Sequence, residues 1–251
     1  MTTDPPSQSP YRQILGIRFF TGTVEEAVAL GLRGGLVAVP SAPVFVSMVE
    51  DPANRDALLG SDFAIADSGL MVLVWNLIKR DNIRRVSGLA YLKTFLEQPA
   101  AREPHAIFWV MPSRESMIRN LAWLNQQGHP TTEDDCYLAP QYGAGPIIDE
   151  ALVKILNARK PAHIIMAIGG GVQERLGHYL KLHVSYRPGI HGTGAAIGFL
   201  SGDQTNIPNW ADRFYLGWLC RCFSAPRTYI PRYWKAQKLV PLLLRYRERR
   251  P

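Results

Sequence analysis

Short apolar runs alternate with segments of helical periodicity along most of the chain, and no other feature constrains the fold as strongly. Each apolar run has the length of a buried strand, and the segments between them suit helices of roughly 10 to 15 residues. Such an alternation builds β-α-β units with parallel strands. We therefore predict an α/β fold, a Rossmann-like, mostly parallel sheet flanked by helices. The predicted strands are residues 14–20, 36–39, 63–66, 106–111, 136–139 and 162–168.

Capping residues mark where several helices begin. Thr23 and Glu26 have the spacing of a capping box, and Asp51 followed by Pro52 is typical of an N-cap and a first turn. Residues 1–11 are rich in Pro and Ser and are predicted to be disordered. The predicted Rossmann-like domain covers residues 12–211. Further helices are expected from about residue 70 and over residues 114–127, 146–158 and 172–182.

The charge of the chain is concentrated at its end. The net charge is +7, yet residues 1–212 hold 18 basic and 20 acidic side chains, whereas residues 213–251 hold ten Lys or Arg and one Glu. Eight aromatic residues are interleaved with these cations. Such a mixture is typical of a surface on an anionic membrane, although nucleic-acid binding and a plain solvated helix are alternatives. We predict that residues 212–251 form a basic, helical, membrane-proximal appendage.

No sequence feature indicates a membrane span or a secreted protein. The longest apolar runs, residues 70–75 and 239–244, are far shorter than the roughly 20 residues that a spanning helix needs. The first ten residues lack the apolar stretch of a secretion signal, and three cysteines are too few for a disulfide framework. We expect a cytoplasmic protein that is soluble or peripheral to the membrane.

One carboxylate follows a predicted strand directly. Asp67 comes after the run that ends at residue 66, on a turn with Ser68 and Gly69. In parallel sheets ligands bind beyond the carboxyl ends of the strands, where a carboxylate can accept a proton from a substrate hydroxyl. The alternative is that Asp67 caps the helix that begins near residue 70. Both interpretations stay open.

A glycine run follows the clearest buried strand. Gly169, Gly170 and Gly171 precede a predicted helix, where backbone N–H groups favour a phosphate, although the run is neither a Walker loop nor a dinucleotide fingerprint. Gln173 and Glu174 occupy the first turn of that helix and can bond a uracil, a ribose or a sugar hydroxyl. A tight turn and a plain dipole-complementing glutamate are the alternatives.

The sequence carries few other signals of catalytic chemistry. No D-x-D motif is present, and the histidines show no convincing zinc spacing, so no metal site is predicted. No G-x-S-x-G elbow indicates a serine hydrolase. His191 lies in a glycine-rich segment, where a structural role is the simpler interpretation.

Several segments together resemble one family, the WecG/TagA/CpsF glycosyltransferases (glycosyltransferase family 26), over about residues 12–235. Their order and spacing carry the resemblance rather than any one motif. The segments are LVAVPSAP (36–43), DPANRDAL (51–58), SDFAIADSGL (61–70), RRVSG (84–88), IGGGVQE (168–174), GAAIGFLSG (194–202) and WLCR (218–221), then PR (226–227) and RY (232–233).

The resemblance implies an inverting, metal-independent hexosyltransferase without a cofactor. Such enzymes pass a sugar, typically N-acetylmannosamine, from a UDP-sugar to a polyprenyl-diphosphate-linked glycan in exopolysaccharide or cell-wall synthesis, at the inner face of the membrane. The resemblance places the catalytic base on Asp67. It places substrate-binding positions on Arg85, Gln173 and Glu174, and on the tail arginines Arg221, Arg227 and Arg232. Gly169 and Gly170 of the glycine run, and Ser41 after the predicted strand 36–39, complete the predicted substrate-binding residues.

The chain departs from the family pattern around the sugar pocket. Val39 and Ser41 stand where relatives have Thr-x-Asn, and Gly198 stands where an aspartate is common. These changes leave the donor sugar open, and the sequence does not give the oligomeric state. Two alternatives follow: a catalytically eroded relative that serves as a non-catalytic partner in a glycan-assembly complex, and a nucleotide-dependent enzyme or nucleic-acid binder. Confinement of the charge to the tail argues against nucleic acid.

Overall fold

The computed structural model describes residues 9–203, 231 and 234–251, and in this part of the chain the strands form one eight-stranded sheet. The strand order is β1-β2-β4-β3-β8-β7-β5-β6. Among the described strands only β1 and β2 pair antiparallel, so the predicted mostly parallel, Rossmann-like α/β fold is confirmed. The strands are β1 (Tyr11–Ile14), β2 (Ile17–Phe20), β3 (Gly35–Ala38), β4 (Phe63–Ile65), β5 (Ile107–Met111), β6 (Cys136–Leu138), β7 (His163–Met166) and β8 (Gly189–His191).

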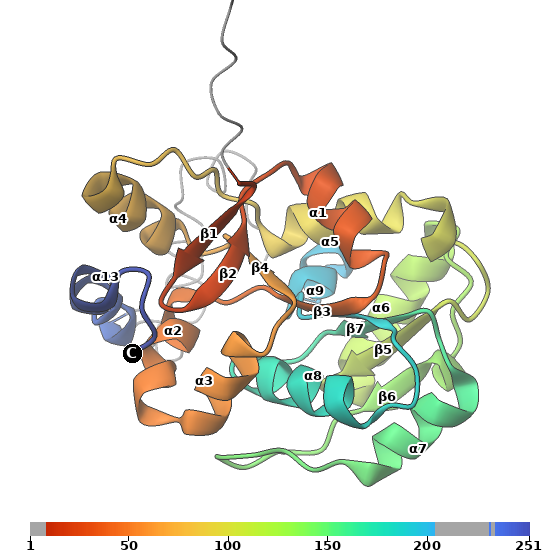
Figure 1. Cartoon of the computed structure of the whole chain (residues 1–251). Coiled ribbons are helices and arrows are strands. Elements are labelled where there is room, and N and C mark those ends of the chain that lie inside the picture. The colour runs from red at the N-terminus through yellow and green to blue at the C-terminus, as the bar shows by residue number, and fades with distance from the viewer. Residues whose placement is uncertain (1–8, 204–230, 232–233) are drawn as a thin grey trace, which may run out of the picture.

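Helices cover both faces of the sheet, because successive strand residues are apolar on both sides. In β3, Val37 packs into the layer of α1, α5, α6 and α9, whereas Leu36 packs into the layer of α7 and α8. Figure 1 shows α1 and α5 on one side of the sheet and α3 and α8 on the other. The helices are α1 (Val24–Gly31), α2 (Ala42–Glu50), α3 (Pro52–Leu59), α4 (Gly69–Lys79), α5 (Gly88–Leu96), α6 (Arg114–Gln126), α7 (Glu150–Arg159), α8 (Val172–His183), α9 (Ala196–Ser201) and α13 (Leu239–Tyr246).

The predicted helix starts agree with the structure where a side chain caps the helix. Thr23 and Glu26 form the capping box of α1. Asp51 accepts hydrogen bonds from the backbone N–H groups of Ala53 and Asn54 at the start of α3. These caps satisfy backbone donors that would otherwise lack partners at a helix start.

Two predictions at the start of the chain are wrong. A single strand over residues 14–20 is replaced by a hairpin, because Leu15 and Gly16 adopt positive φ angles of 53° and 79° and reverse the chain. Tyr11 begins β1 and packs on Phe20, so disorder does not extend to residue 11. Residues 1–8 lie outside the described part of the chain.

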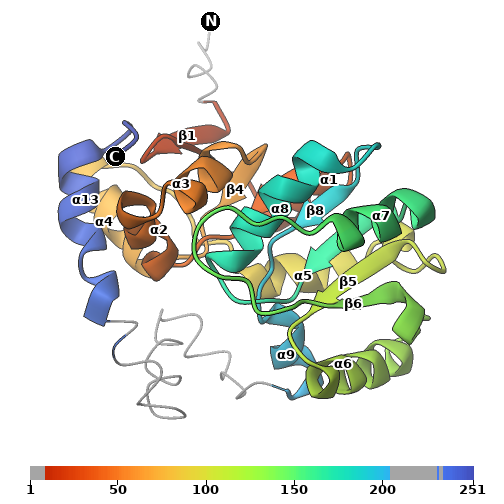
Figure 2. The same ribbon diagram turned by 90° about the horizontal axis from the view of Figure 1, so that it is seen from below.

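The end of the chain packs against the body of the protein. Leu239 and Leu243 of α13 are fully buried against α2 and α4 (Figure 2). The turn of the β1–β2 hairpin donates two backbone hydrogen bonds to the chain end, from Leu15 N to Arg247 O (2.7 Å) and from Gly16 N to Glu248 O (2.9 Å). Helix α13, which the sequence assigned to the appendage, therefore packs into the apolar core of the protein. The predicted boundary at residues 211–212 lies outside the described residues.

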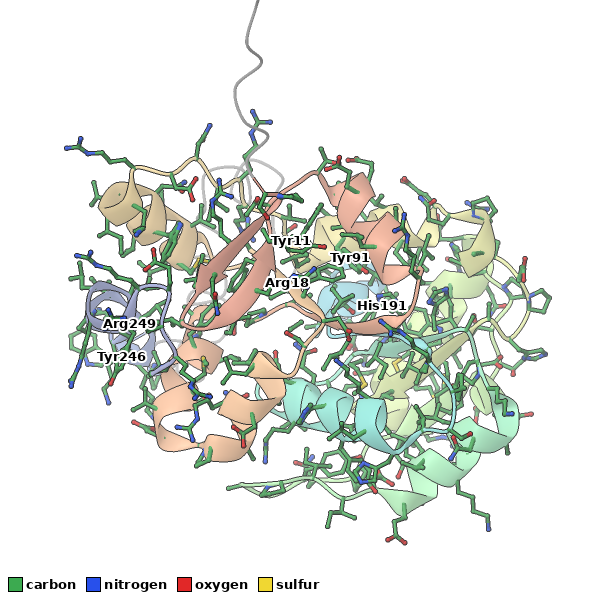
Figure 3. All side chains as sticks on the ribbon, in the orientation of Figure 1. Tyr11, Arg18, Tyr91, His191, Tyr246 and Arg249 are labelled. Atoms are coloured by element: carbon green, nitrogen blue, oxygen red, sulfur yellow. The ribbon has the colours of Figure 1, made fainter. Side chains whose placement is uncertain are left out.

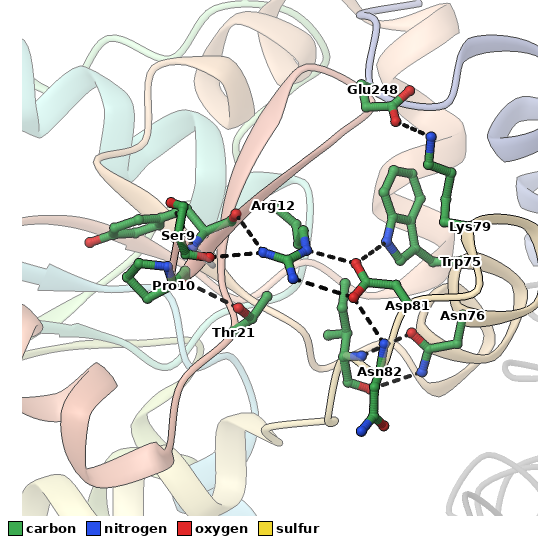
Figure 4. Close-up of polar contacts among 12 residues, drawn as sticks. Ser9, Pro10, Arg12, Thr21, Trp75, Asn76, Lys79, Asp81, Asn82 and Glu248 are labelled. Carbon is green, nitrogen blue, oxygen red and sulfur yellow. Dashed lines mark hydrogen bonds and ion pairs between the residues drawn. The ribbon is translucent and has the colours of Figure 1, made fainter. Parts of the chain in front are cut away.

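A polar network fixes the far end of α4 beside the chain end (Figure 4). Asp81, just past α4, accepts hydrogen bonds from Arg12 Nε (2.7 Å) and Trp75 Nε1 (3.2 Å). Lys79 forms an ion pair with Glu248. Within the described ranges, no helix is long and apolar enough to cross a bilayer.

Candidate active site

The cap of α4 is Ser68, not Asp67. The Ser68 hydroxyl accepts a hydrogen bond from the backbone N–H of Met71 (3.3 Å), which is the bond that a helix cap makes. The interpretation of Asp67 as the helix cap is therefore wrong. The residue lies at the carboxyl end of β4, and its carboxylate serves another purpose.

The Asp67 carboxylate is held by one of its two oxygens. Oδ1 accepts a hydrogen bond from the backbone N–H of Gly88 (3.1 Å), the first residue of α5, and lies 3.4 Å from Arg85 Nη2. Arg85 also donates from Nε to the backbone carbonyl of Asp67 (2.6 Å). No hydrogen bond from another described residue reaches Oδ2. The carboxylate is thus oriented at one oxygen and available at the other.

The glycine loop after β7 leads into the first turn of α8. Glu174 accepts a hydrogen bond from the backbone N–H of Gly171, which adopts a φ of +87°. Gln173 Nε2 donates to Glu174 Oε1 (3.0 Å), and both side chains are buried. A β-carbon added at Gly169 or Gly171 would meet no atom within 4 Å, so the loop borders open space. Glu174 therefore shapes the turn, and the loop and helix start have the geometry of an anion site.

Arg175 supports this loop, although the sequence analysis did not single it out. Its guanidinium donates to the backbone carbonyls of Gly171 (3.0 Å) and Gly143 (2.9 Å), and the residue is 9% exposed. It thereby ties the glycine loop to the segment that follows β6. The sequence signal that could have identified Arg175 is its position directly after Glu174.

Glycine contacts connect Asp67 to Gln173 across the sheet edge. A β-carbon at Gly88 would lie 3.6 Å from the carbonyl oxygen of Thr193, which follows β8. A β-carbon at Gly194 would lie 3.6 Å from Gln173 Oε1. The structure thus brings together the residues predicted at the ends of β4 and β7, with the β8 exit loop between them.

Three buried side-chain oxygens at this edge have no hydrogen-bond partner among the described residues. They are Ser41 Oγ after β3, Thr193 Oγ1 after β8 and Gln173 Oε1 after β7. β3, β8 and β7 are neighbours in the sheet, so these groups follow adjacent strands. Buried polar groups ordinarily have partners. Their concentration here is typical of an edge that binds a ligand rich in hydroxyl groups.

A groove of about 590 Å³ lies beside the Asp67–Arg85 pair. Its walls are the loop after β2, the first turn of α1 and the segment before α5, with Arg84, Arg85 and Ser87 among its lining residues. This volume is in the range of small-molecule sites. Residues far apart in the chain line this groove, so the sequence does not predict it.

His191 is a core residue, as the sequence analysis favoured. Its Nδ1 lies 2.8 Å from the Tyr91 hydroxyl, and Figure 3 shows the two side chains together between α5 and the sheet. Burial lowers the pKa of His191, and burial lowers the pKa of the neighbouring His163 to about 4. Both imidazoles are therefore neutral near pH 7 and fix α5 to the sheet.

The remaining predicted positions concern the tail and metals. Arg221, Arg227 and Arg232 lie outside the described residues, so their predicted roles stay predictions. Within the described ranges, no group of three or more His, Cys, Asp or Glu side chains has an arrangement that could hold a metal ion.

Comparison with protein families gives one match over nearly the whole chain. Residues 12–251 match the model of the glycosyl transferase WecG/TagA/CpsF family. A search of curated proteins finds no match. The matched range includes the site residues at the carboxyl ends of the strands and helix α13 at the chain end. The chain belongs to the WecG/TagA/CpsF family of glycosyltransferases.

Proposed function

We propose that this glycosyltransferase moves a sugar, N-acetylmannosamine or a related hexose, from a UDP-sugar to a polyprenyl-diphosphate-linked glycan with inversion. Asp67 is the proposed base. One observation carries this role: Ser68 caps α4, and the Asp67 carboxylate is oriented through Oδ1 while Oδ2 bonds no described residue. A carboxylate held in this way can accept a proton without losing its orientation.

In the proposed reaction, an acceptor hydroxyl oxygen attacks the anomeric carbon of the donor. Its proton passes to Asp67 Oδ2 as the new C–O bond forms. The bond between the anomeric carbon and the diphosphate breaks on the opposite face, and UDP departs with the electron pair. Inversion follows because attack and departure occur on opposite faces of one carbon.

The donor is proposed to bind on the Gln173 side of Asp67. The open loop at Gly169 and Gly170 and the start of α8 suit the diphosphate, because helix N-terminal N–H groups favour anions. The buried oxygens of Ser41 and Gln173, which bond no described residue, suit sugar hydroxyls, and Glu174 fixes the amide of Gln173. Arg85 and the tail arginines Arg221, Arg227 and Arg232 are proposed to stabilise the departing charge.

The acceptor is proposed to bind on the other side of Asp67, in the groove beside Arg85. Arg84 lines this groove and suits the diphosphate of a lipid-linked acceptor. In this proposed arrangement Asp67 lies between donor and acceptor, where it can accept the proton of the attacking acceptor hydroxyl. We further propose that the enzyme works without a metal or cofactor, does not bind nucleic acid, and acts at the cytoplasmic face of the membrane in exopolysaccharide or cell-wall synthesis.

A donor screen tests this function. The full chain is incubated with a panel of UDP-sugars and a short-chain polyprenyl-diphosphate-linked sugar, and transfer to the lipid is followed together with the anomeric configuration of the product. We expect one donor to be transferred with inverted configuration. Binding of UDP-sugars without transfer from any of them would favour the non-catalytic partner instead, and retained configuration would remove the single-displacement mechanism.

A further inference from the structure

The outer side of α4 carries apolar residues where a surface helix would ordinarily be polar. Leu70 to Ile78 contains one polar residue, Asn76, and the helix packs its inner side into the core through Met71, Val72 and Trp75. On the opposite side Leu73 is 55% exposed and Leu77 is 80% exposed. A helix that is apolar all round is ordinarily buried or in lipid. We therefore expect an apolar binding partner, protein or lipid, to cover the outer side of α4.

The chain end, which lies beside α4, also exposes apolar residues. α13 packs beside α4, and it too exposes an apolar residue, Leu244, at 51%. Trp234, just before α13, is 71% exposed. We call Leu73, Leu77, Leu244 and Trp234, on these two neighbouring segments, the α4–α13 surface.

Cations are frequent on the two segments that carry the α4–α13 surface. Lys79 and Arg80 end α4, and residues 234–251 contribute six further Lys or Arg against one acid. That acid, Glu248, is paired with Lys79, and the nearby Glu50 lies 3.8 Å from Lys238. Tyr246 and Arg249 lie at the same end of the molecule (Figure 3). Exposed leucines and a tryptophan on segments rich in Lys and Arg match the apolar and charged layers of an anionic bilayer surface.

We propose that the α4–α13 surface docks on an anionic membrane, with Leu73 and Leu77 inserted among the lipids. The occupant is a bilayer rather than a second copy of the chain, because an isologous dimer would bring the same cations face to face. The inference rests on the proposed membrane-facing function, but not on the identity of the donor. It assigns the contact to α4 in the body as well as to the basic chain end.

This contact would put the membrane close to the proposed base. α4 begins two residues after Asp67, and Leu77 lies roughly 14 Å along the helix from its cap at Ser68. A lipid-linked acceptor that leaves the bilayer beside α4 therefore has a short path to Asp67. The arrangement suits an acceptor whose lipid remains in the membrane during transfer.

Vesicle binding tests the proposal. The full chain, Leu73→Gln/Leu77→Gln and the matched control Leu182→Gln are sedimented with phosphatidylcholine vesicles that contain or lack phosphatidylglycerol. Leu182 of α8 is 64% exposed but lies away from the α4–α13 surface. We expect binding of the wild type to anionic vesicles only, weakened by salt, and a loss of tenfold or more in the double variant. The Leu182 variant should bind as the wild type does.

Three controls separate the outcomes. Circular dichroism should show a fold unchanged in both variants, because the substituted side chains are exposed. Transfer to a water-soluble acceptor should be unchanged in the double variant, because the substituted residues lie outside the proposed site. A wild type that binds vesicles but transfers no sugar would contradict the proposed function and leave the membrane contact intact. Equal vesicle binding by the double variant and the wild type would overturn the α4 contact. A wild-type dimer that the double variant converts to monomer, with vesicle binding unchanged, would identify a second copy as the occupant and overturn the proposal.

Discussion

Two aspartates at the two ends of β4 have different surroundings. Asp62 directly precedes the strand and Asp67 follows it, and their side chains are exposed to nearly the same degree, 29% and 28%. Asp62 uses both oxygens: Oδ2 bonds the backbone N–H of Leu36 (2.7 Å) and Lys181 Nζ (2.8 Å), and Oδ1 lies 3.5 Å from Arg187. Asp67 bonds described residues through Oδ1 alone. The number of carboxylate oxygens that bond described residues, rather than burial, thus distinguishes Asp62 from the proposed base, Asp67.

The surroundings of each aspartate follow from the sheet. Polar groups at the amino ends of β3, β4 and β8 join neighbouring elements: Lys181 of α8, for example, also donates to the carbonyl of Gly60 after α3 (2.8 Å). At the carboxyl ends, Ser41 and Thr193 have hydroxyls that no described residue satisfies. One edge of the sheet thus contributes to stability and the other is available to a ligand.

Replacement of Asp67 is expected to have the largest effect. Asp67→Asn keeps the shape of the side chain and the hydrogen bond from Gly88, but an amide cannot accept the proton. Turnover should fall by about 10² to 10⁴, the usual contribution of a general base. Calorimetric binding of UDP and the thermal midpoint should stay close to those of the wild type. Turnover near the wild-type value would remove the proposed distinction between the two aspartates.

A smaller effect is expected in the groove beside Asp67. Arg84→Ala removes a cation that we assign to the acceptor diphosphate, so the KM for the acceptor should rise about tenfold while the KM for the donor is unchanged. The matched control is Arg33→Ala, an exposed arginine before β3 at the opposite edge of the sheet. A rise in the donor KM instead would assign the groove to the donor.

Asp62→Asn should affect stability rather than turnover. Burial opposes ionisation of Asp62, but the hydrogen bonds from Lys181 and Leu36 and the charges of Lys181 and Arg187 outweigh it and lower its pKa. The ion pairs therefore stabilise the fold above about pH 4, the unfolded pKa of an aspartate, and are lost as the pH falls through the lowered folded pKa. In denaturant unfolding at pH 7, the free energy of unfolding of Asp62→Asn should be about 1–2 kcal/mol lower than that of the wild type. This difference should become smaller as the pH falls. A loss of turnover without a loss of stability would reverse the assignment.

Removal of divalent cations should have no effect. The proposed mechanism assigns the charge of the departing diphosphate to arginines and helix N–H groups, so turnover in excess EDTA should equal that of the untreated enzyme. Turnover that is lost in EDTA and restored by Mn²⁺ would show that the carboxylates at this edge act together with a metal.

Local chemistry made part of the fold predictable from sequence. Thr23 with Glu26 and Asp51 with Pro52 use their own side chains to start helices, so neighbouring residues suffice to identify them. The hairpin turn at Leu15 and Gly16 was missed because one glycine within an apolar run is a weak signal. Helix α2 was not predicted because Pro43, which stands in its first turn, follows closely after a strand, where a proline is as typical of a chain break as of a helix start. β8, of three residues, was too short to predict from its pattern.

The same limit applies to the site. Gln173 and Glu174 could be predicted because the glycine run, the strand and the helix start are adjacent in sequence. The groove, the contact between Gly88 and Thr193, and the packing of α13 on α4 join residues far apart in the chain, so only the folded structure shows them. The choice between cap and base at Asp67 depended on which of two adjacent side chains bonds Met71, and the sequence left both open.

Chemical rescue tests the proton-accepting role of Asp67 most directly. Asp67→Ala and the matched Asp62→Ala are assayed for sugar transfer with and without formate, a small carboxylate that can enter the space left by the lost side chain. We predict that Asp67→Ala loses turnover by about 10² to 10⁴ and regains part of it with formate. Formate should leave the wild type and Asp62→Ala unchanged. Transfer by Asp67→Ala at the wild-type rate without formate would contradict the account.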